Sequence, residues 1–196
     1  MYLPSKSDGS VDVIIELGRA DFRIVVNPNI PRLCELVVNS YARNLWTGMR
    51  PNEVSRLKWE DIDFSEKVIT VKKENSKTGG ARQIEMCPVL REWLDPLKKK
   101  SKAKICPKNW LRKWKSLRED AGFKHIWVND VLRHTYASYF AKRFRDLPRL
   151  QLNMGHRDLS LLRSRYVNMV GIKKSDAKAF FETLGRNITS EALPLN

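Results

Sequence analysis

Cysteine and histidine are scarce in this chain, with three of each among 196 residues. The cysteines Cys34, Cys87 and Cys106 are odd in number and far apart, and no Cys-x-x-Cys pair or Cys/His cluster occurs. This spacing predicts free thiols and neither a disulfide framework nor a zinc site. A Walker-type phosphate loop and an acidic metal cluster are also missing, so we expect no metal and no cofactor.

Long apolar runs are missing as well. No segment has the length needed to span a bilayer, and the start of the chain lacks a basic-then-apolar signal peptide. Positive charge, in contrast, is abundant: 37 Lys and Arg face 22 Asp and Glu, a formal net charge of +15. Such an excess predicts a polyanionic partner, either nucleic acid or an anionic membrane surface. Without membrane signals, we expect a partner in the cytoplasm and no membrane association.

Hydrophobic periodicity predicts a mainly α domain with one small antiparallel β-sheet (α+β). Residues 1–30 form an N-terminal extension or interdomain segment with two β-prone runs, 31–187 form the domain, and 188–196 form a loose tail. The segment Trp59–Phe64 leads into a first strand, and two further strands flank a polar hairpin at Val68–Val71 and Gln83–Met86. Helices are predicted at residues 31–45, 51–57, 89–100, 108–121, 131–145, 148–154, 159–163 and 175–184.

The segment Thr47–Leu57 places Arg50 where a tight turn meets the start of a helix, with Glu53 three residues later. The first turn of a helix leaves N–H groups unpaired and carries a positive dipole end. A guanidinium at this position therefore favours binding of an oxyanion such as phosphate. An exposed arginine paired with Glu53 is the alternative interpretation.

A second arginine, Arg133, lies near the start of the predicted helix 131–145, within Leu132–Ser138. Two arginines on two helix starts could hold the two non-bridging oxygens of one phosphodiester. Downstream, Gly155 is predicted to end a helix and leave His156 at a turn. Tyr166 then follows a short helix, beside two arginines. A turn histidine and an interface aromatic are the alternatives for these two residues.

A lysine, Lys77, lies in Ser76-Lys77-Thr78-Gly79-Gly80 between the two hairpin strands. It is either a solvated surface lysine or one that reaches a substrate oxygen. In this order, the arginine boxes, the hairpin lysine, Met154-Gly155-His156 and Tyr166 resemble the tyrosine recombinase family, which includes phage integrases. The resemblance covers roughly residues 31–184 and implies the fold of that family's catalytic domain.

The resemblance assigns a role to each matching residue. Tyr166 would attack the scissile phosphate, forming a 3′-phosphotyrosyl link and freeing a 5′-hydroxyl. Arg50 and Arg133 would stabilise the charge of the phosphorane. Lys77 would protonate the leaving oxygen, and His156 would hydrogen-bond or orient the phosphate. Neither a metal nor ATP is needed, because the covalent intermediate conserves the bond energy.

The chain departs from the family pattern at two places. Asp130 stands where the family usually has a histidine, three residues before Arg133. Its carboxylate could accept the proton of Tyr166 or pair with Arg133. The spacing from His156 to Tyr166 is one residue longer than the commonest one. Tyr136 and Tyr139 are poorer nucleophile candidates, because they lie inside a helix that we expect to pack on the core.

The resulting hypothesis is a site-specific recombinase (integrase) that cleaves and rejoins double-stranded DNA, as a homo-oligomer, a tetramer, on the DNA. The family implies a bacterial cell and a phage or mobile-element origin, and a separate N-terminal DNA-binding domain for which this chain has no room. We therefore expect either a catalytic-domain fragment, which we favour, or a smaller replacement of that domain by residues 1–30. A non-catalytic DNA-binding protein and a type IB topoisomerase-like enzyme are the alternatives. The apolar face of the helix Ser175–Leu184 would dock on a neighbouring protomer or pack within the chain.

Overall fold

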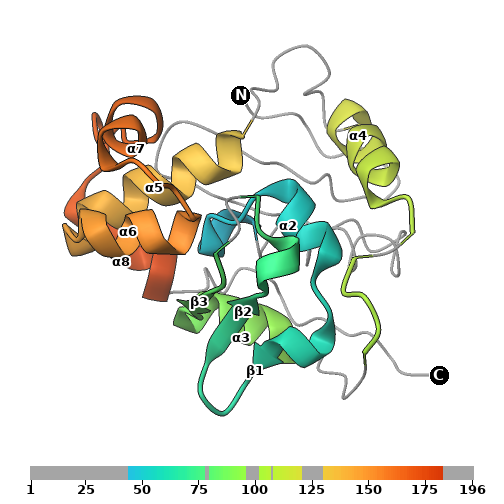
Figure 1. Cartoon of the computed structure of the whole chain (residues 1–196). Helices are drawn as coiled ribbons and strands as arrows, with labels where there is room; N and C mark the ends of the chain where they lie inside the picture. Colours follow the sequence, from blue (N-terminus) through green and yellow to red (C-terminus); the bar gives the residue numbers. More distant parts are fainter. Residues whose placement is uncertain (1–43, 78–79, 96–101, 107, 121–129, 183–196) are drawn as a thin grey trace.

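The computed structural model describes residues 44–77, 80–95, 102–106, 108–120 and 130–182 (Figure 1). The β-prone runs of residues 1–30 and the C-terminal tail lie outside these ranges. So does the predicted helix 31–45, except for its end, where residues 44–47 are helical. The described part is mainly helical with one three-stranded sheet, which confirms the α+β class.

The sheet is an antiparallel meander of β1 (Ile62–Asp63), β2 (Val68–Val71) and β3 (Arg82–Glu85) in the order β1-β2-β3. Ile69 pairs with Ile62 on one side and with Ile84 on the other, and all three side chains are buried. This alternation of buried and exposed positions is typical of a sheet with one face on the core. The 3₁₀ helices η1 (Trp59–Asp61) and η2 (Lys73–Asn75) flank β1 and β2, so Trp59–Asp61 is not part of a strand.

The other predicted helices are confirmed within the described ranges, outside which residues 96–100, 121 and 183–184 of three of them lie. They are α2 (Pro51–Arg56), α3 (Pro88–Leu94), α4 (Trp110–Asp120), α5 (Val131–Phe144), α6 (Leu147–Met154), α7 (Leu159–Tyr166) and α8 (Lys174–Glu182). The largest correction concerns α7, which continues to Tyr166, so the tyrosine ends the helix and does not follow it. Asp158 caps the start of α7 by accepting a hydrogen bond from the backbone N–H of Ser160.

The longest described helix, α5, is the centre of the helical layer. It packs against α6, α7 and α8, and α6 also contacts β3, which joins the helices to the sheet (Figure 1). The rings of Phe180 and Phe181 from α8 pack against Tyr139 and Phe140 of α5. Because Ala177, Phe180 and Phe181 are buried within the chain, the described part of α8 packs intramolecularly. Across the described residues, no helix combines the length and apolar character needed to cross a membrane.

Candidate active site

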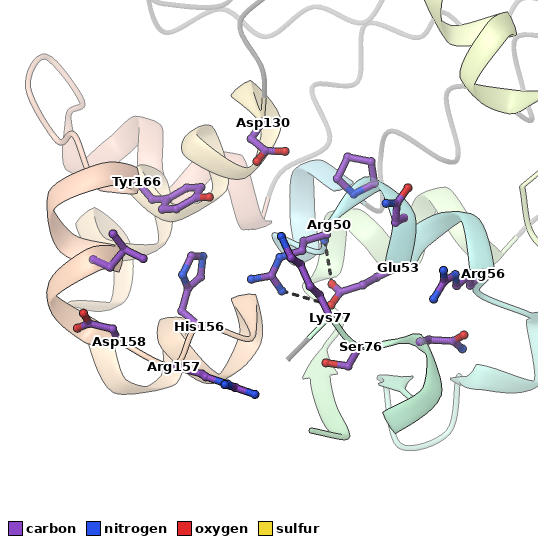
Figure 2. Close-up of a pocket in the computed structure, with 14 residues that line it drawn as sticks. Arg50, Glu53, Arg56, Ser76, Lys77, Asp130, His156, Arg157, Asp158 and Tyr166 are labelled. Carbon is purple, nitrogen blue, oxygen red and sulfur yellow. Dashed lines mark hydrogen bonds and ion pairs between the residues drawn. The ribbon is translucent and has the colours of Figure 1, made fainter. Parts of the chain in front are cut away.

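Five of the six predicted site residues line one pocket of about 680 Å³ (Figure 2). They come from separate parts of the chain: the start of α2, the segment after η2, the start of α5, the turn after α6 and the end of α7. Figure 2 shows Tyr166 and His156 on one side of the pocket, with Arg50 and Lys77 on the other. The residues are Arg50, Lys77, Asp130, His156 and Tyr166. The sixth, Arg133, is buried next to the pocket and only 1% exposed.

Arg50 is the N-cap residue of α2, with extended backbone angles, and Pro51 occupies the first helical position. Its backbone N–H donates to Glu53 Oε2 at 2.9 Å, which pairs one donor at the helix start with a carboxylate. Its guanidinium Nη1 lies 3.4 Å from Glu53 Oε1. The turn-to-helix arrangement expected around Arg50 is therefore confirmed, with Glu53 as its partner.

Arg82, at the start of β3, belongs to the same cluster and was not predicted from the sequence. Its Nη2 and Nη1 donate to the two carboxylate oxygens of Glu53, at 2.7 and 3.2 Å. Its Nε donates to the carbonyl oxygen of Asn153 at 2.8 Å. Burial opposes ionisation of Glu53, but hydrogen bonds from Arg82 and the Arg50 backbone outweigh it and lower the pKa of the carboxyl group. Glu53 is therefore a buried carboxylate shared by two arginines.

The C-terminal end of α6 brings three guanidinium groups together. The Met154 carbonyl accepts from Arg50 Nη1 at 3.4 Å and from Arg133 Nη2 at 3.3 Å. The Gly155 carbonyl accepts from Arg50 Nη2 at 3.2 Å. Helix C-termini carry unpaired carbonyl oxygens and a negative dipole end, so cations are favoured there. The carboxylates of Glu53 and Asp130 balance the three guanidinium charges only in part, so the cluster keeps an excess of positive charge.

Arg133 is held from several sides inside the protein. Its Nη1 donates to the carbonyl of Gly48, and its Nη2 contacts His156 Nε2 at 2.9 Å. Its Nε is buried and has no hydrogen-bond partner among the described residues. Burial lowers the pKa of Arg133 to about 10, with a contribution from the nearby Arg50 charge. The side chain still carries its charge at neutral pH.

The ring of His156 follows the αL cap of α6 at Gly155, where φ is +62°, as the glycine position predicts. Because a guanidinium can only donate, His156 Nε2 accepts from Arg133 and carries no proton. Burial, together with the charges of Arg133 and Arg50, lowers the pKa of His156 from 6.5 to about 4. At neutral pH the ring is uncharged, and its Nδ1–H remains available as a donor.

The depressed pKa of His156 predicts acid destabilisation. Between pH 6.5 and about 4 the unfolded chain binds a proton that the folded one does not. The contribution to stability is complete above the unfolded pKa and is lost as pH falls through this range. Burial also lowers the pKa of His134, in the same direction. We expect the unfolding free energy, from urea titrations, to fall from about pH 7.5 to about pH 5. A His156→Gln variant should lose less, and an equal loss would contradict this assignment.

Aromatic and cationic groups surround Tyr166. His134 stacks on its ring, with centroids 4.6 Å apart and planes at 20°. His156 approaches edge-on at 4.7 Å, and the Arg133 Cζ lies 5.5 Å from the ring centroid. The phenol points into the pocket, toward the side that carries Arg50 (Figure 2). His134 is part of the predicted second arginine box, yet the sequence assigned it no role.

The other tyrosines of α5 do not reach the pocket. Tyr136 is 2% exposed, its hydroxyl accepts from Asn153 Nδ2 at 3.0 Å, and burial raises its pKa. Tyr139 is also buried, against Phe180 of α8. Both observations agree with the expectation that these rings belong to the core.

Asp130 is the N-cap residue of α5, in the αL conformation with φ at 58°. Its carbonyl accepts from the backbone N–H groups of Arg133 and His134, at 2.8 and 3.0 Å. The ion pairs between described residues do not include one from Asp130 to Arg133, but the Asp130 charge partly offsets the effect of burial, which lowers the pKa of Arg133, so pairing stays an alternative. Lys77 is exposed and lines the pocket from the opposite side, beside Ser76. In the described ranges, no three His, Cys, Asp or Glu side chains gather as they would around a metal ion.

The fold combines a helical layer with a small antiparallel sheet, and its site sets an arginine cluster beside a tyrosine. The chain matches the model of the phage integrase family over residues 44–170 and belongs to this family. Tyrosine recombinase XerA of Pyrococcus furiosus is 32% identical over 129 residues, which cover 58% of this chain and 44% of that protein. The chain thus spans less than half the length of this relative.

Solved structures share the fold. The XerA recombinase crystal structure gives a TM-score of 0.53 at 20% identity, covering 76% of this chain and 59% of that chain. The Tn1549 transposon integrase, in complex with circular intermediate DNA, gives 0.51 at 18% identity, covering 75% and 58%. The catalytic domain of bacteriophage HP1 integrase gives 0.50 at 18% identity, covering 69% and 84%. These similarities confirm the predicted tyrosine recombinase catalytic-domain fold.

Proposed function

We propose that this chain cleaves and rejoins double-stranded DNA through a covalent 3′-phosphotyrosyl intermediate, as the catalytic part of a site-specific recombinase. The observation that carries the proposal is the cluster of Arg50, Arg82 and Arg133, which Glu53 and Asp130 balance only in part, next to the phenol of Tyr166. A phosphodiester would supply the negative charge that the cluster lacks. The named DNA complexes of structural relatives and the formal charge of +15 support DNA as the partner.

In the cleavage step, the Tyr166 oxygen attacks phosphorus, a P–O(Tyr) bond forms and the P–O5′ bond breaks. The phenolic proton leaves to a base, for which the Asp130 carboxylate is the candidate because it lines the same pocket. Lys77 delivers a proton to the departing 5′-oxygen. Rejoining is the reverse reaction, in which a 5′-hydroxyl attacks the phosphotyrosine and releases the Tyr166 phenol. The number of phosphodiester bonds is therefore unchanged.

Arg50 and Arg133 stabilise the extra charge on the non-bridging oxygens as the phosphorane forms. Arg50 borders the pocket, whereas Arg133 lies deeper and contacts it through His156. The neutral His156 can donate from Nδ1 to the phosphate. Binding of the anion would offset the field of the arginines, so the pKa of His156 would rise in the complex.

We further propose that the protein acts as a homo-oligomer, a tetramer, on DNA in the cytoplasm of a bacterial cell, as part of a phage or mobile element. The family membership supports this proposal. The match covers only 44% of XerA, which supports the idea that a DNA-binding domain outside this chain makes further contacts with the DNA.

A covalent capture experiment tests the function. The 196-residue chain is incubated with a pool of nicked DNA duplexes whose central segment is random, because the nick lets the freed strand diffuse away. We expect an SDS-resistant protein–DNA adduct, with the DNA on Tyr166 in peptide mass spectra, and none from the Tyr166→Phe variant. An adduct that persists in Tyr166→Phe would sink the assignment.

The capture experiment, together with a DNA-binding assay and a plasmid-relaxation assay, separates the alternatives. Salt-sensitive DNA binding without any adduct would identify a non-catalytic DNA-binding protein. Relaxation of supercoiled plasmid by wild-type protein, with no sequence enriched among the captured duplexes, would identify a topoisomerase-like enzyme.

A further inference from the structure

One face of α5 contacts both the ring and the backbone of Tyr166. His134 and Ser138 are four residues apart, so they lie on the same side of the helix, over neighbouring turns. The imidazole of His134 stacks on the phenol ring at 4.6 Å. The hydroxyl of Ser138 donates to the carbonyl of Tyr166 at 3.3 Å. The end of α7 therefore rests on two side chains of α5.

Both side chains make a second contact with the same segment. Ser138 Oγ accepts from the backbone N–H of Asn168 at 2.9 Å. One hydroxyl therefore binds both the Tyr166 carbonyl at the end of α7 and the Asn168 N–H just beyond it. The backbone of Arg165, the residue before Tyr166, favours the charged form of His134, although burial lowers the pKa of that ring overall. Helix ends leave carbonyl groups unpaired, and here α5 supplies partners for them. The ring, the last helical residues and the residues after the helix are thus fixed together.

This geometry limits how Tyr166 can move. Its ring lies between the stacked His134 and the edge of His156, with Arg133 on the same helix as His134. A phenol that attacks phosphorus in line must hold its oxygen close to the position it takes in the transition state. The contacts to α5 hold the ring of Tyr166 near Arg133 before any DNA is present.

We propose that His134 and Ser138 are positioning residues for Tyr166, which hold the nucleophile of this chain beside the arginine cluster of the same chain. This inference rests on the proposed function for its effect on rate. The arrangement of the contacts can be tested without it. Neither side chain takes a proton or contacts the phosphate in this role.

The rate test uses single-turnover adduct formation with captured duplexes. His134→Ala, which removes the stack, should slow adduct formation by about 100-fold, the loss expected from a misplacement of about 1 Å. His134→Phe keeps an aromatic plane and should recover most of that rate. DNA affinity and the unfolding midpoint should stay close to wild type. The matched control is Thr135→Ala, because the Thr135 hydroxyl bonds only to its own helix, at Val131 O.

An activity-independent test follows the amide of Asn168 in the DNA-free protein. Ser138→Ala removes its acceptor and should speed hydrogen exchange at residue 168 by roughly fivefold, the worth of one hydrogen bond. Exchange in Thr135→Ala should match wild type. The exchange measurement separates the positioning contacts from the proposed function. A wild-type protein that forms no adduct would refute the proposed function, whereas faster exchange in Ser138→Ala would still support the contact of Ser138 with Asn168.

Three results would overturn the positioning role. The first is a wild-type rate of adduct formation in His134→Ala. The second is His134→Phe as slow as His134→Ala, because the stack would then not be what matters. The third is a loss of DNA affinity and thermal stability in parallel with the rate, which would indicate a structural role only.

Discussion

Replacing Glu53 with alanine is expected to lower the free energy of unfolding by about 3–5 kcal/mol, the loss typical of breaking a buried ion pair from one side. The carboxylate is 2% exposed and accepts from the Arg50 backbone and from two nitrogens of Arg82. Without it, the three guanidinium groups keep only backbone carbonyls and the His156 ring as hydrogen-bond partners. Like charges in a buried site repel one another, and Arg82, at the start of β3, would lose its carboxylate partner.

The control for this substitution is Glu60→Ala. Glu60 pairs with Lys72 at 3.1 Å and Lys58 at 3.4 Å, but on the surface, so its loss should destabilise the fold far less than the loss of Glu53. Urea unfolding of both variants at neutral pH measures the difference. Glu53→Gln keeps the shape of the side chain, removes the charge and replaces one acceptor oxygen with an NH₂ donor. If Glu53→Ala proves as mild as Glu60→Ala, the cluster does not depend on its carboxylate.

The sequence predicts best those parts of the site that depend on local chemistry. A proline after Arg50 and a glutamate three residues later are enough to place the start of α2. Gly155 is enough to predict the end of α6, because the αL conformation at a helix end favours glycine. The strand pair around Lys77 follows from the β-branched run Val68–Val71 and the glycine-containing segment that comes after it.

The sequence predicts poorly those parts that depend on long-range packing. Arg82 is 29 positions from Glu53, and only the fold brings the two within 2.7 Å. The stack of His134 on Tyr166 joins α5 to α7 across 32 positions (166 minus 134), with no periodic signal between them. The burial of Arg133 is also unexpected, because arginine is rarely buried without a carboxylate partner.

The end of α6 explains why residues from so many elements meet. Asn153, Met154 and Gly155 present successive carbonyl oxygens, and each accepts from an arginine of another element. The end of α6 thus contacts Arg82, Arg133 and Arg50 through its main-chain carbonyl oxygens. Because these acceptors are backbone groups, no residue type at these positions marks them in the sequence.

Gly48→Ala is expected to be the most disruptive small substitution in the site. Gly48 has φ at +64°, which costs an alanine about 1–2 kcal/mol. A Cβ here would also lie 2.7 Å from Tyr136 Cε1, closer still to Cδ1, and 3.0 Å from Met154 Cγ. Overpacking of this kind costs about 1–3 kcal/mol. The two costs together predict a loss of roughly 2–5 kcal/mol, measured by urea unfolding.

The effect of Gly48→Ala should extend to cleavage, because the Gly48 carbonyl accepts from Arg133 Nη1. Backbone displacement at residue 48 moves that acceptor, so adduct formation should slow even where the variant remains folded. Gly80→Ala is the matched control, since nothing lies within 4 Å of a Cβ at Gly80. In a Tyr136→Ala background the clash with the ring disappears, and Gly48→Ala should then cost only the backbone share and the milder contact with Met154 Cγ. An undiminished cost in that background would show that the Tyr136 ring is not what excludes a side chain at residue 48.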